Sequence, residues 1–264
     1  MDPLRVGFLV GLGLLAGTLA ACAGDRAGGE AAASASIAAA VAHPDRPDEH
    51  RADDAQRKPQ RILEFFEVEP GMRVLDVLAG GGYYTELLAR VVGPRGQVVF
   101  HNNQPFVDFM GEGIAARTAG GRLPNVKPLQ VELPDLDLPD GGYDAVFMIL
   151  VYHDLFWDPA DGSWPSVDLR AFLAEVHTAL KPGGILAIVD HSAPPGSDLT
   201  RTASTLHRID EAAVKRQITG AGFLLEGETD LLRNADDTLA VGVFDPSMRR
   251  RTDRFVLRFR KRDT

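Results

Sequence analysis

VLDVLAGGGY, residues 74–83, is the most informative segment of this 264-residue chain. An apolar run ends at Asp76 and passes through three consecutive glycines into a helical pattern that begins at Tyr83. Glycine lets the backbone turn sharply and approach a ligand, because no Cβ stands in the way. The start of the helix offers free N–H groups and the positive end of the helix dipole. The segment therefore predicts a strand, a ligand-binding loop and a helix, an arrangement that suits any nucleotide.

Strand and helix patterns alternate on both sides of this segment. Short apolar runs predict strands, and apolar residues spaced three or four apart predict helices. The predicted strands are 73–77, 96–101, 126–131, 143–150, 185–190, 223–230 and 254–261, and the predicted helices are 50–66, 83–91, 103–117, 169–180 and 209–221. Such alternation predicts a doubly wound α/β fold with a mostly parallel sheet. Residues 239–244 are compatible with one further short strand.

The first 22 residues resemble an export signal. Residues 6–21 are an apolar run, too short for a membrane-spanning helix of about twenty residues. The run ends in Leu19-Ala20-Ala21-Cys22, which resembles a bacterial lipobox, where the cysteine receives a lipid. We expect an exported, periplasmic lipoprotein anchored to a bacterial membrane. The alternatives are an ordinary signal peptide with a chance cysteine and a simple membrane anchor.

The expected domain plan follows from this reading of the amino terminus. Residues 1–22 form the lipoprotein signal peptide, ending at Cys22, the chain's single cysteine, so that an internal disulfide is excluded. Residues 23–48 are rich in Ala, Gly, Ser, Asp and Pro without periodicity, which predicts a flexible linker. Residues 49–264 form the domain. Its partners are expected to be small molecules and not nucleic acid, because the net charge is −9.

Several segments downstream of the glycine loop sharpen the prediction. Asp76 and Gly80–Gly82 are followed by Glu132, by Pro139-Asp140-Gly141-Gly142-Tyr143-Asp144 and by Leu180-Lys181-Pro182-Gly183-Gly184. In this order they resemble the class I, S-adenosylmethionine-dependent methyltransferases that act on small molecules. The resemblance covers roughly residues 60–260. It implies a Rossmann-like seven-stranded sheet, mostly parallel, with an antiparallel last strand.

A second set of segments is similar to a narrower group. Tyr152-His153-Asp154, Val189-Asp190-His191, His207-Arg208-Ile209-Asp210 and Arg254–Phe259 resemble a group of predicted, exported bacterial methyltransferases. This similarity agrees with the lipobox at the amino terminus.

The resemblance implies S-adenosylmethionine as the cofactor and assigns its contacts. In that family the glycine loop holds the methionine part, an acid ending the second strand binds the ribose, and an acid after the third strand meets the adenine. The cofactor-binding residues implied here are Asp76, Ala79, Gly80, Gly82, Asn102 and Glu132. The chain departs from the family pattern twice: Leu78 replaces the first glycine, and Asn102 stands where the ribose-binding acid belongs. An amide can still bind a hydroxyl, but it lacks the charge-assisted bond of a carboxylate.

Histidines follow several of the predicted strands, and the carboxyl ends of parallel strands are where ligands bind. We expect His153 and Asp154 to be catalytic, as a base for an acceptor that carries a proton. The alternative is that His153 caps the strand and Asp154 starts a turn. With Asp190, His191 and His207 these residues also offer metal-ligand types, but no His-x-x-x-His spacing occurs, so no metal is predicted.

Other aromatic residues have two interpretations each. The segment LFWDPADGSWPS, residues 155–166, suits a lid over an apolar substrate or a loop that packs its own aromatic rings. Tyr83 and Tyr84 suit a pocket wall or a buried position under the sheet. The leading function is methyl transfer from S-adenosylmethionine to a small molecule. The alternatives are a non-catalytic binding protein on the same scaffold and a metal-dependent hydrolase.

Overall fold

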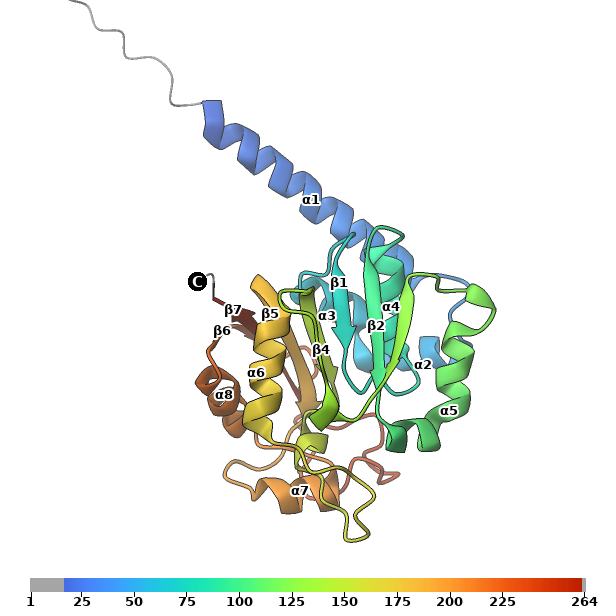
Figure 1. Ribbon diagram of the computed structural model, residues 1–264, viewed down its shortest axis with the longest axis vertical. Coiled ribbons are helices and arrows are strands. Elements are labelled where there is room, and N and C mark those ends of the chain that lie inside the picture. The colour runs from blue at the N-terminus through green and yellow to red at the C-terminus, as the bar shows by residue number, and fades with distance from the viewer. Residues whose placement is uncertain (1–16, 263–264) are drawn as a thin grey trace, which may run out of the picture.

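The computed structural model of the chain describes the backbone of residues 17–262 and the side chains of residues 28–262. Seven strands form one sheet in the order β3-β2-β1-β4-β5-β7-β6 (Figure 1). Their bounds are β1 Arg73–Asp76, β2 Gln97–Asn102, β3 Val126–Gln130, β4 Tyr143–Ile149, β5 Leu180–His191, β6 Phe223–Thr229 and β7 Arg254–Lys261. β7 runs antiparallel to both of its neighbours, and the other pairs are parallel. The predicted fold class is confirmed, although residues 239–244 form no strand.

Helices cover both faces of the sheet (Figure 1). Leu75 of β1 packs in a core with α6 and α8, whereas its neighbour Val74 packs in a second core with α1, α3 and α4. Because both faces are covered, the central strands are apolar throughout. The helices are α1 Gly17–Val41, α2 Asp48–Arg57, α3 Pro59–Phe65, α4 Tyr83–Val92, α5 Gln104–Thr118, α6 Leu169–Ala179, α7 Leu199–Leu206 and α8 Glu211–Gly220, with short 3₁₀ turns η1 Ala119–Gly121, η2 Leu133–Asp135 and η3 His153–Phe156.

α1 occupies most of the region that was predicted to be a flexible linker. The linker prediction over residues 23–48 is wrong for its second half, because Ile37 and Ala40 are buried in the core against α3 and α4. Alanine is the strongest helix former, and its small side chain lets the helix approach its neighbours closely. The single helix predicted over residues 50–66 is two helices, separated at Lys58 by a left-handed residue.

The amino-terminal end of α1 points away from the domain (Figure 1). Residues 1–16, and with them most of the predicted export signal, lie outside the described residues. Over residues 17–262, no helix is both long enough and apolar enough to cross a membrane.

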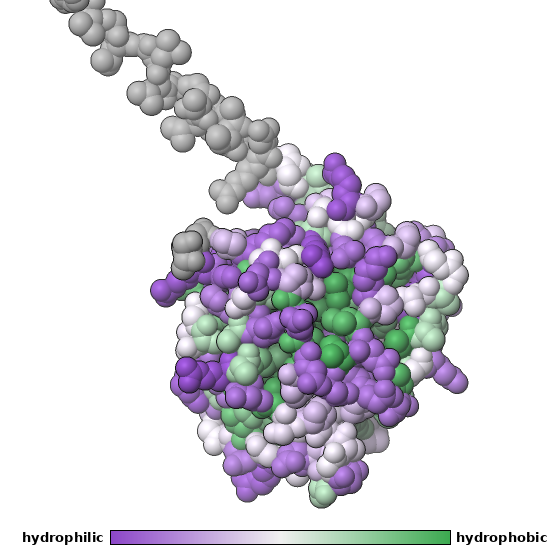
Figure 2. Space-filling model, viewed as in Figure 1, coloured by the Kyte–Doolittle hydropathy of each residue, from purple (hydrophilic) through white to green (hydrophobic). Residues whose placement is uncertain are grey.

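The carboxyl ends of β1 and β4 adjoin each other and position the site. The two strands pair in parallel, so the glycine loop after β1 and the loop that leads from β4 into η3 leave the sheet side by side. On the face seen in Figure 2, polar side chains cover most of the surface, and a smaller apolar group gathers near the centre, between α6 and α5.

Candidate active site

The glycine loop alternates between ordinary and left-handed backbone. Leu78, Gly80 and Gly82 have φ of 49°, 56° and 75°. Leu78 is the only one with a side chain, and that side chain is buried in the core. Its N–H donates to Nδ1 of His101 at 3.2 Å, which fixes the strained residue from the side of β2. The leucine that departs from the family glycine therefore anchors the loop.

Asn102 holds the same loop from the end of β2. Its Oδ1 accepts from the Gly80 N–H at 2.8 Å, and its Nδ2 donates to the Gly80 carbonyl at 3.2 Å. The amide is buried, so these bonds engage both of its polar atoms inside the protein. The residue expected to bind a ribose instead fixes the backbone of Gly80.

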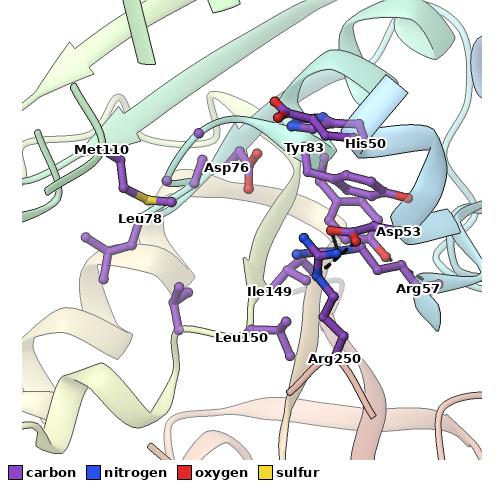
Figure 3. A pocket seen from close by; sticks show the side chains of 16 residues that line it. His50, Asp53, Arg57, Asp76, Leu78, Tyr83, Met110, Ile149, Leu150 and Arg250 are labelled. Carbon is purple, nitrogen blue, oxygen red and sulfur yellow. Dashed lines mark hydrogen bonds and ion pairs between the residues drawn. The ribbon is translucent and has the colours of Figure 1, made fainter. Parts of the chain in front are cut away.

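A cavity of about 310 Å³ opens beside the loop, at the carboxyl ends of β1 and β4 (Figure 3). Its volume is at the lower end of the usual range for small-molecule sites. Of the predicted cofactor residues, Asp76, Ala79 and Gly80 line it. The remaining lining residues are Glu49, His50, Asp53, Arg57, Leu78, Gly81, Tyr83, Tyr84, Met110, Ile149, Leu150, Val151 and Arg250.

One wall of the cavity comes from segments that the sequence did not associate with the site. α2 contributes Asp53 and Arg57, and the turn before β7 contributes Arg250, whose Nε lies 3.1 Å from Asp53 Oδ1 (Figure 3). The guanidinium of Arg57 lies over the Tyr83 ring, 4.5 Å from its centroid. The Tyr83 hydroxyl donates to Asp54 at 2.5 Å. Both interpretations of Tyr83 are thus met, because the ring is buried and also walls the cavity.

Asp76 is the acidic residue that ends β1, directly before the glycine loop. Its side chain is buried, and its Oδ2 accepts from the Thr85 hydroxyl at 2.6 Å. Burial raises the pKa of this carboxyl to about 7, although the hydrogen bond from Thr85 opposes the shift. An ammonium group in the cavity would favour the ionised form of Asp76.

Gly82 and Glu132, like Asn102, are predicted cofactor residues that do not line the cavity. Gly82 begins α4, where an added Cβ would lie 2.9 Å from the Arg117 side chain. Glu132 Oε1 accepts from the Gln104 N–H at 2.9 Å, whereas its Oε2 is buried without a partner among the described side chains. At the start of α5, Asn103 Nδ2 is buried without a partner as well. An unpaired acceptor and an unpaired donor match in kind the hydrogen-bonding atoms of an adenine edge, although neither Glu132 nor Asn103 lines the cavity.

His153 and Asp154 lie in a buried cluster that does not line the cavity. His153 Nδ1 lies 2.8 Å from Asp190 Oδ1, and its Nε2 lies 3.3 Å from Asp154 Oδ1. Burial alone would lower the pKa of His153, but the charges of Asp154 and Asp190 outweigh it and raise the pKa to about 9. His207 joins the cluster, with Nδ1 4.0 Å from Asp154 Oδ1. Burial and the charge of His153 lower the pKa of His207 to about 4.

The aromatic loop packs on itself. The rings of Trp157 and Trp164 lie 5.1 Å apart, and Trp164 lies 5.7 Å from Phe106 of α5. None of these three residues lines the cavity. The second interpretation of residues 155–166, a loop that buries its own rings, agrees with this arrangement.

Known proteins share this architecture. Residues 75–188 match a family described as "Methyltransferase domain". The chain is 31% identical over 140 residues to the ubiquinone/menaquinone biosynthesis C-methyltransferase UbiE of Teredinibacter turnerae, a match that covers 53% of this chain and 51% of that one. It is 30% identical over 139 residues to an uncharacterized methyltransferase of Synechocystis, covering 53% and 56%. The chain thus spans about half the length of the curated relatives it matches.

Solved structures are similar over a longer part of the chain. An S-adenosylmethionine-dependent methyltransferase from Aquifex aeolicus superposes with a TM-score of 0.53 at 24% identity, over 81% of this chain and 98% of that one. The cyclase SpnF superposes with a TM-score of 0.55 at 18% identity, over 80% and 82%. The likeness to these structures concerns the fold alone. Residues 75–188 are thus similar to the methyltransferase domain family, within a fold that solved methyltransferase structures share.

Proposed function

We propose that this protein transfers a methyl group from S-adenosylmethionine to a small molecule. The observation that carries the proposal is the cavity beside the glycine loop, at the edge of the sheet where ligands of open α/β folds bind. Asp76 would hold the ammonium group of the cofactor, and the backbone around Gly80 would lie along its methionine part. S-adenosylmethionine supplies an electrophilic methyl group on a sulfonium. The chain has to align the acceptor with that methyl group and exclude water.

The walls of the cavity indicate what kind of acceptor fits. Ile149, Leu150 and Val151 give one apolar side, and Arg57 and Arg250 give a charged side. Because Asp53 pairs with both arginines, a small molecule with an apolar body and a polar group suits this pair of walls. Several curated relatives are C-methyltransferases by name, which supports carbon as the accepting atom. A base role for His153 and Asp154 stays a prediction, since neither residue lines the cavity.

Calorimetry with S-adenosylmethionine and S-adenosylhomocysteine tests the proposal. Gly80→Val should weaken binding of both by at least about ten-fold, because φ at Gly80 is +56° and an added Cβ would meet Met110 Sδ at 3.0 Å. Gly111→Val is the matched control, since an added Cβ there meets nothing within 4 Å. No binding by the wild type, or equal binding by the Gly80 variant, would overturn the proposal.

A non-catalytic binding protein is the second candidate. The observation in its favour is the pair of bonds between Asn102 and Gly80, which takes the amide away from a ribose. Such a protein would bind S-adenosylhomocysteine or another nucleoside without turnover. Release of S-adenosylhomocysteine from S-adenosylmethionine in the presence of candidate acceptors separates the two candidates.

The proposal includes a location. The lipobox at Leu19–Cys22 supports export and a lipid anchor on Cys22, with the domain outside the cytoplasm. The partners proposed are a small-molecule substrate and a bacterial membrane.

A further inference from the structure

We propose that His153, Asp154 and His207 bind one divalent transition-metal ion, with Zn²⁺ as the ion that best suits the donors. One ligand atom from each residue lies within 4.8 Å of the other two. His153 and Asp154 belong to η3, and His207 ends α7, which packs against η3. The fold therefore brings together residues that are far apart in the sequence. This site is separate from the cofactor cavity and does not depend on methyl transfer.

The two carboxylates beside the His153 ring favour a positive charge at this position. Each ring nitrogen faces a carboxylate oxygen, Nδ1 that of Asp190 at 2.8 Å and Nε2 that of Asp154 at 3.3 Å. A neutral imidazole carries only one N–H, so one lone pair would face a carboxylate oxygen. A proton or a metal ion on Nε2 removes this repulsion. A metal ion would bind the lone pair of His153 Nε2 and take Asp154 as its second ligand.

Asp190 orients His153 from behind. Its Oδ2 accepts from the His153 backbone N–H at 2.8 Å, and its Oδ1 accepts from the His191 backbone N–H at 2.7 Å. The carboxylate is thus fixed by the end of β5 while it holds Nδ1 of the ring. A carboxylate on the far nitrogen is the usual support of a metal-binding histidine, because it sets the tautomer and the ring orientation.

His207 supplies the third donor and lies on the side from which solvent reaches the site. Its side chain is 24% exposed, whereas the side chain of His153 is 4% exposed, so the site opens to solvent on the His207 side. The ring is flanked by Trp157 at 5.7 Å and by Phe244 at 5.0 Å.

The donor set and spacing select the ion. Two imidazoles and one carboxylate with an open position are typical of Zn²⁺ sites that keep a water or substrate oxygen. Tetrahedral ligands at zinc distances lie about 3.4 Å apart. The separations here are 3.3 Å between His153 and Asp154 and 4.0 Å between Asp154 and His207, and all three ligand atoms lie within 4.8 Å of one another. A small displacement of the half-buried His207 ring would therefore bring them to zinc distances.

Titration with Co²⁺ tests the site. The full-length chain, without a polyhistidine tag and stripped of metal with a chelator, is titrated while the visible ligand-field absorption of the ion is recorded. We expect one equivalent of Co²⁺ to bind and to be displaced by Zn²⁺. His207→Gln and Asp154→Asn should each weaken binding by at least about ten-fold, and Asp190→Asn by about ten-fold through the His153 ring. His177→Gln, a half-buried histidine packed on Phe223, is the control that should bind as the wild type does.

Two outcomes would overturn the metal site. One is the absence of stoichiometric Co²⁺ binding by the wild type, and the other is unchanged binding by both His207→Gln and Asp154→Asn. Circular dichroism establishes that each variant is folded. As a second measurement, Zn²⁺ should raise the melting temperature of the wild type and of His177→Gln more than that of His207→Gln.

Discussion

Asn102 illustrates how a site residue can act through the backbone. Its position at the end of β2 is the one predicted from the family pattern, but its amide is bound to Gly80 from both sides. Leu78 also holds the loop, through its side chain buried in the core. Its left-handed backbone is fixed by the hydrogen bond from its N–H to His101. The two departures from the family pattern both stabilise the loop. Both side chains therefore hold the loop in place, but neither replaces the acid that would bind a ribose.

Replacing Asn102 with Asp should destabilise the protein. A carboxylate cannot donate to the Gly80 carbonyl, so a buried acceptor loses its partner and faces a negative charge. We expect a loss of about 1–3 kcal/mol in the free energy of unfolding, measured with denaturant, and weaker binding of S-adenosylhomocysteine. Gln217→Glu is the matched amide-to-acid control, because half-buried Gln217 does not line the cavity and its Oε1 accepts from the Tyr152 hydroxyl, as a carboxylate also can. Tighter binding by Asn102→Asp would show instead that this residue contacts the ribose.

Asp76 should make cofactor binding depend on pH. Its pKa of about 7 leaves the carboxyl neutral in mild acid, and only the ionised form pairs with an ammonium group. Affinity for S-adenosylhomocysteine should therefore rise by up to about ten-fold per unit as pH approaches 7 and then level off. Calorimetry at several pH values measures this, and Asp76→Asn should remove the slope. A wild-type slope that Asp76→Asn does not change would assign the effect to another group.

The raised pKa of Asp76 has the opposite effect on the folding stability of the ligand-free protein, which falls as pH rises. The carboxyl of Asp76 ionises near its ordinary pKa of 3.8 in the unfolded chain and only near 7 in the folded one. The folded state therefore binds more protons between these values, so this group lowers stability progressively as pH rises from about 4 to about 7.

At the scale of elements, the sequence predicted what depends on local pattern. Apolar runs bounded by glycine and proline placed β1 and β4 within a residue of where they end, and Asp76, Ala79 and Gly80 were found because they follow one such run. α1 was missed because alanine-rich sequence without charge periodicity resembles a tether. The wall formed by α2 and Arg250 was missed as well, because it depends on contacts between distant segments.

The second half of α1 should prove to be part of the core. Ile37 is almost completely buried against α3 and α4, so Ile37→Ala should lower the free energy of unfolding by about 2–5 kcal/mol. Ala35 is exposed on the same helix, and Ala35→Ser should change stability by less than about 0.5 kcal/mol. Chemical denaturation compares the two variants. Equal stability of Ile37→Ala and wild type would restore the linker interpretation.

For the whole molecule, the binding edge of the sheet and the exit of α1 lie at opposite ends of the domain (Figure 1). The glycine loop follows the carboxyl end of β1, while the amino-terminal part of α1 leaves beyond the other end of the strands. This arrangement separates ligand entry from any attachment at the amino terminus.

Cys22→Ser tests the attachment. The lipobox predicts that the cysteine receives the lipid and that the signal is cleaved before it, so the variant should accumulate as unprocessed, unlabelled precursor. Growth with a labelled fatty acid, followed by mass spectrometry of the amino-terminal peptide, measures both. An unmodified Cys22 peptide from the wild type would contradict the lipid anchor.

If Cys22 carries the proposed lipid, the helical form of α1 would also set the orientation of the domain on the membrane. An α-helix rises 1.5 Å per residue, so the segment from Cys22 to Ala33, the first buried position among the side chains that the structure describes, would span about 16 Å. With the proposed lipid on Cys22, α1 would act as a rigid spacer that holds the domain at a fixed distance from the membrane. A flexible linker would instead let the domain reorient freely. Because the cavity lies at the far end of the sheet, its mouth would face the aqueous compartment. Acceptors dissolved in that compartment would then reach the site directly, and molecules embedded in the same leaflet would have to leave it first.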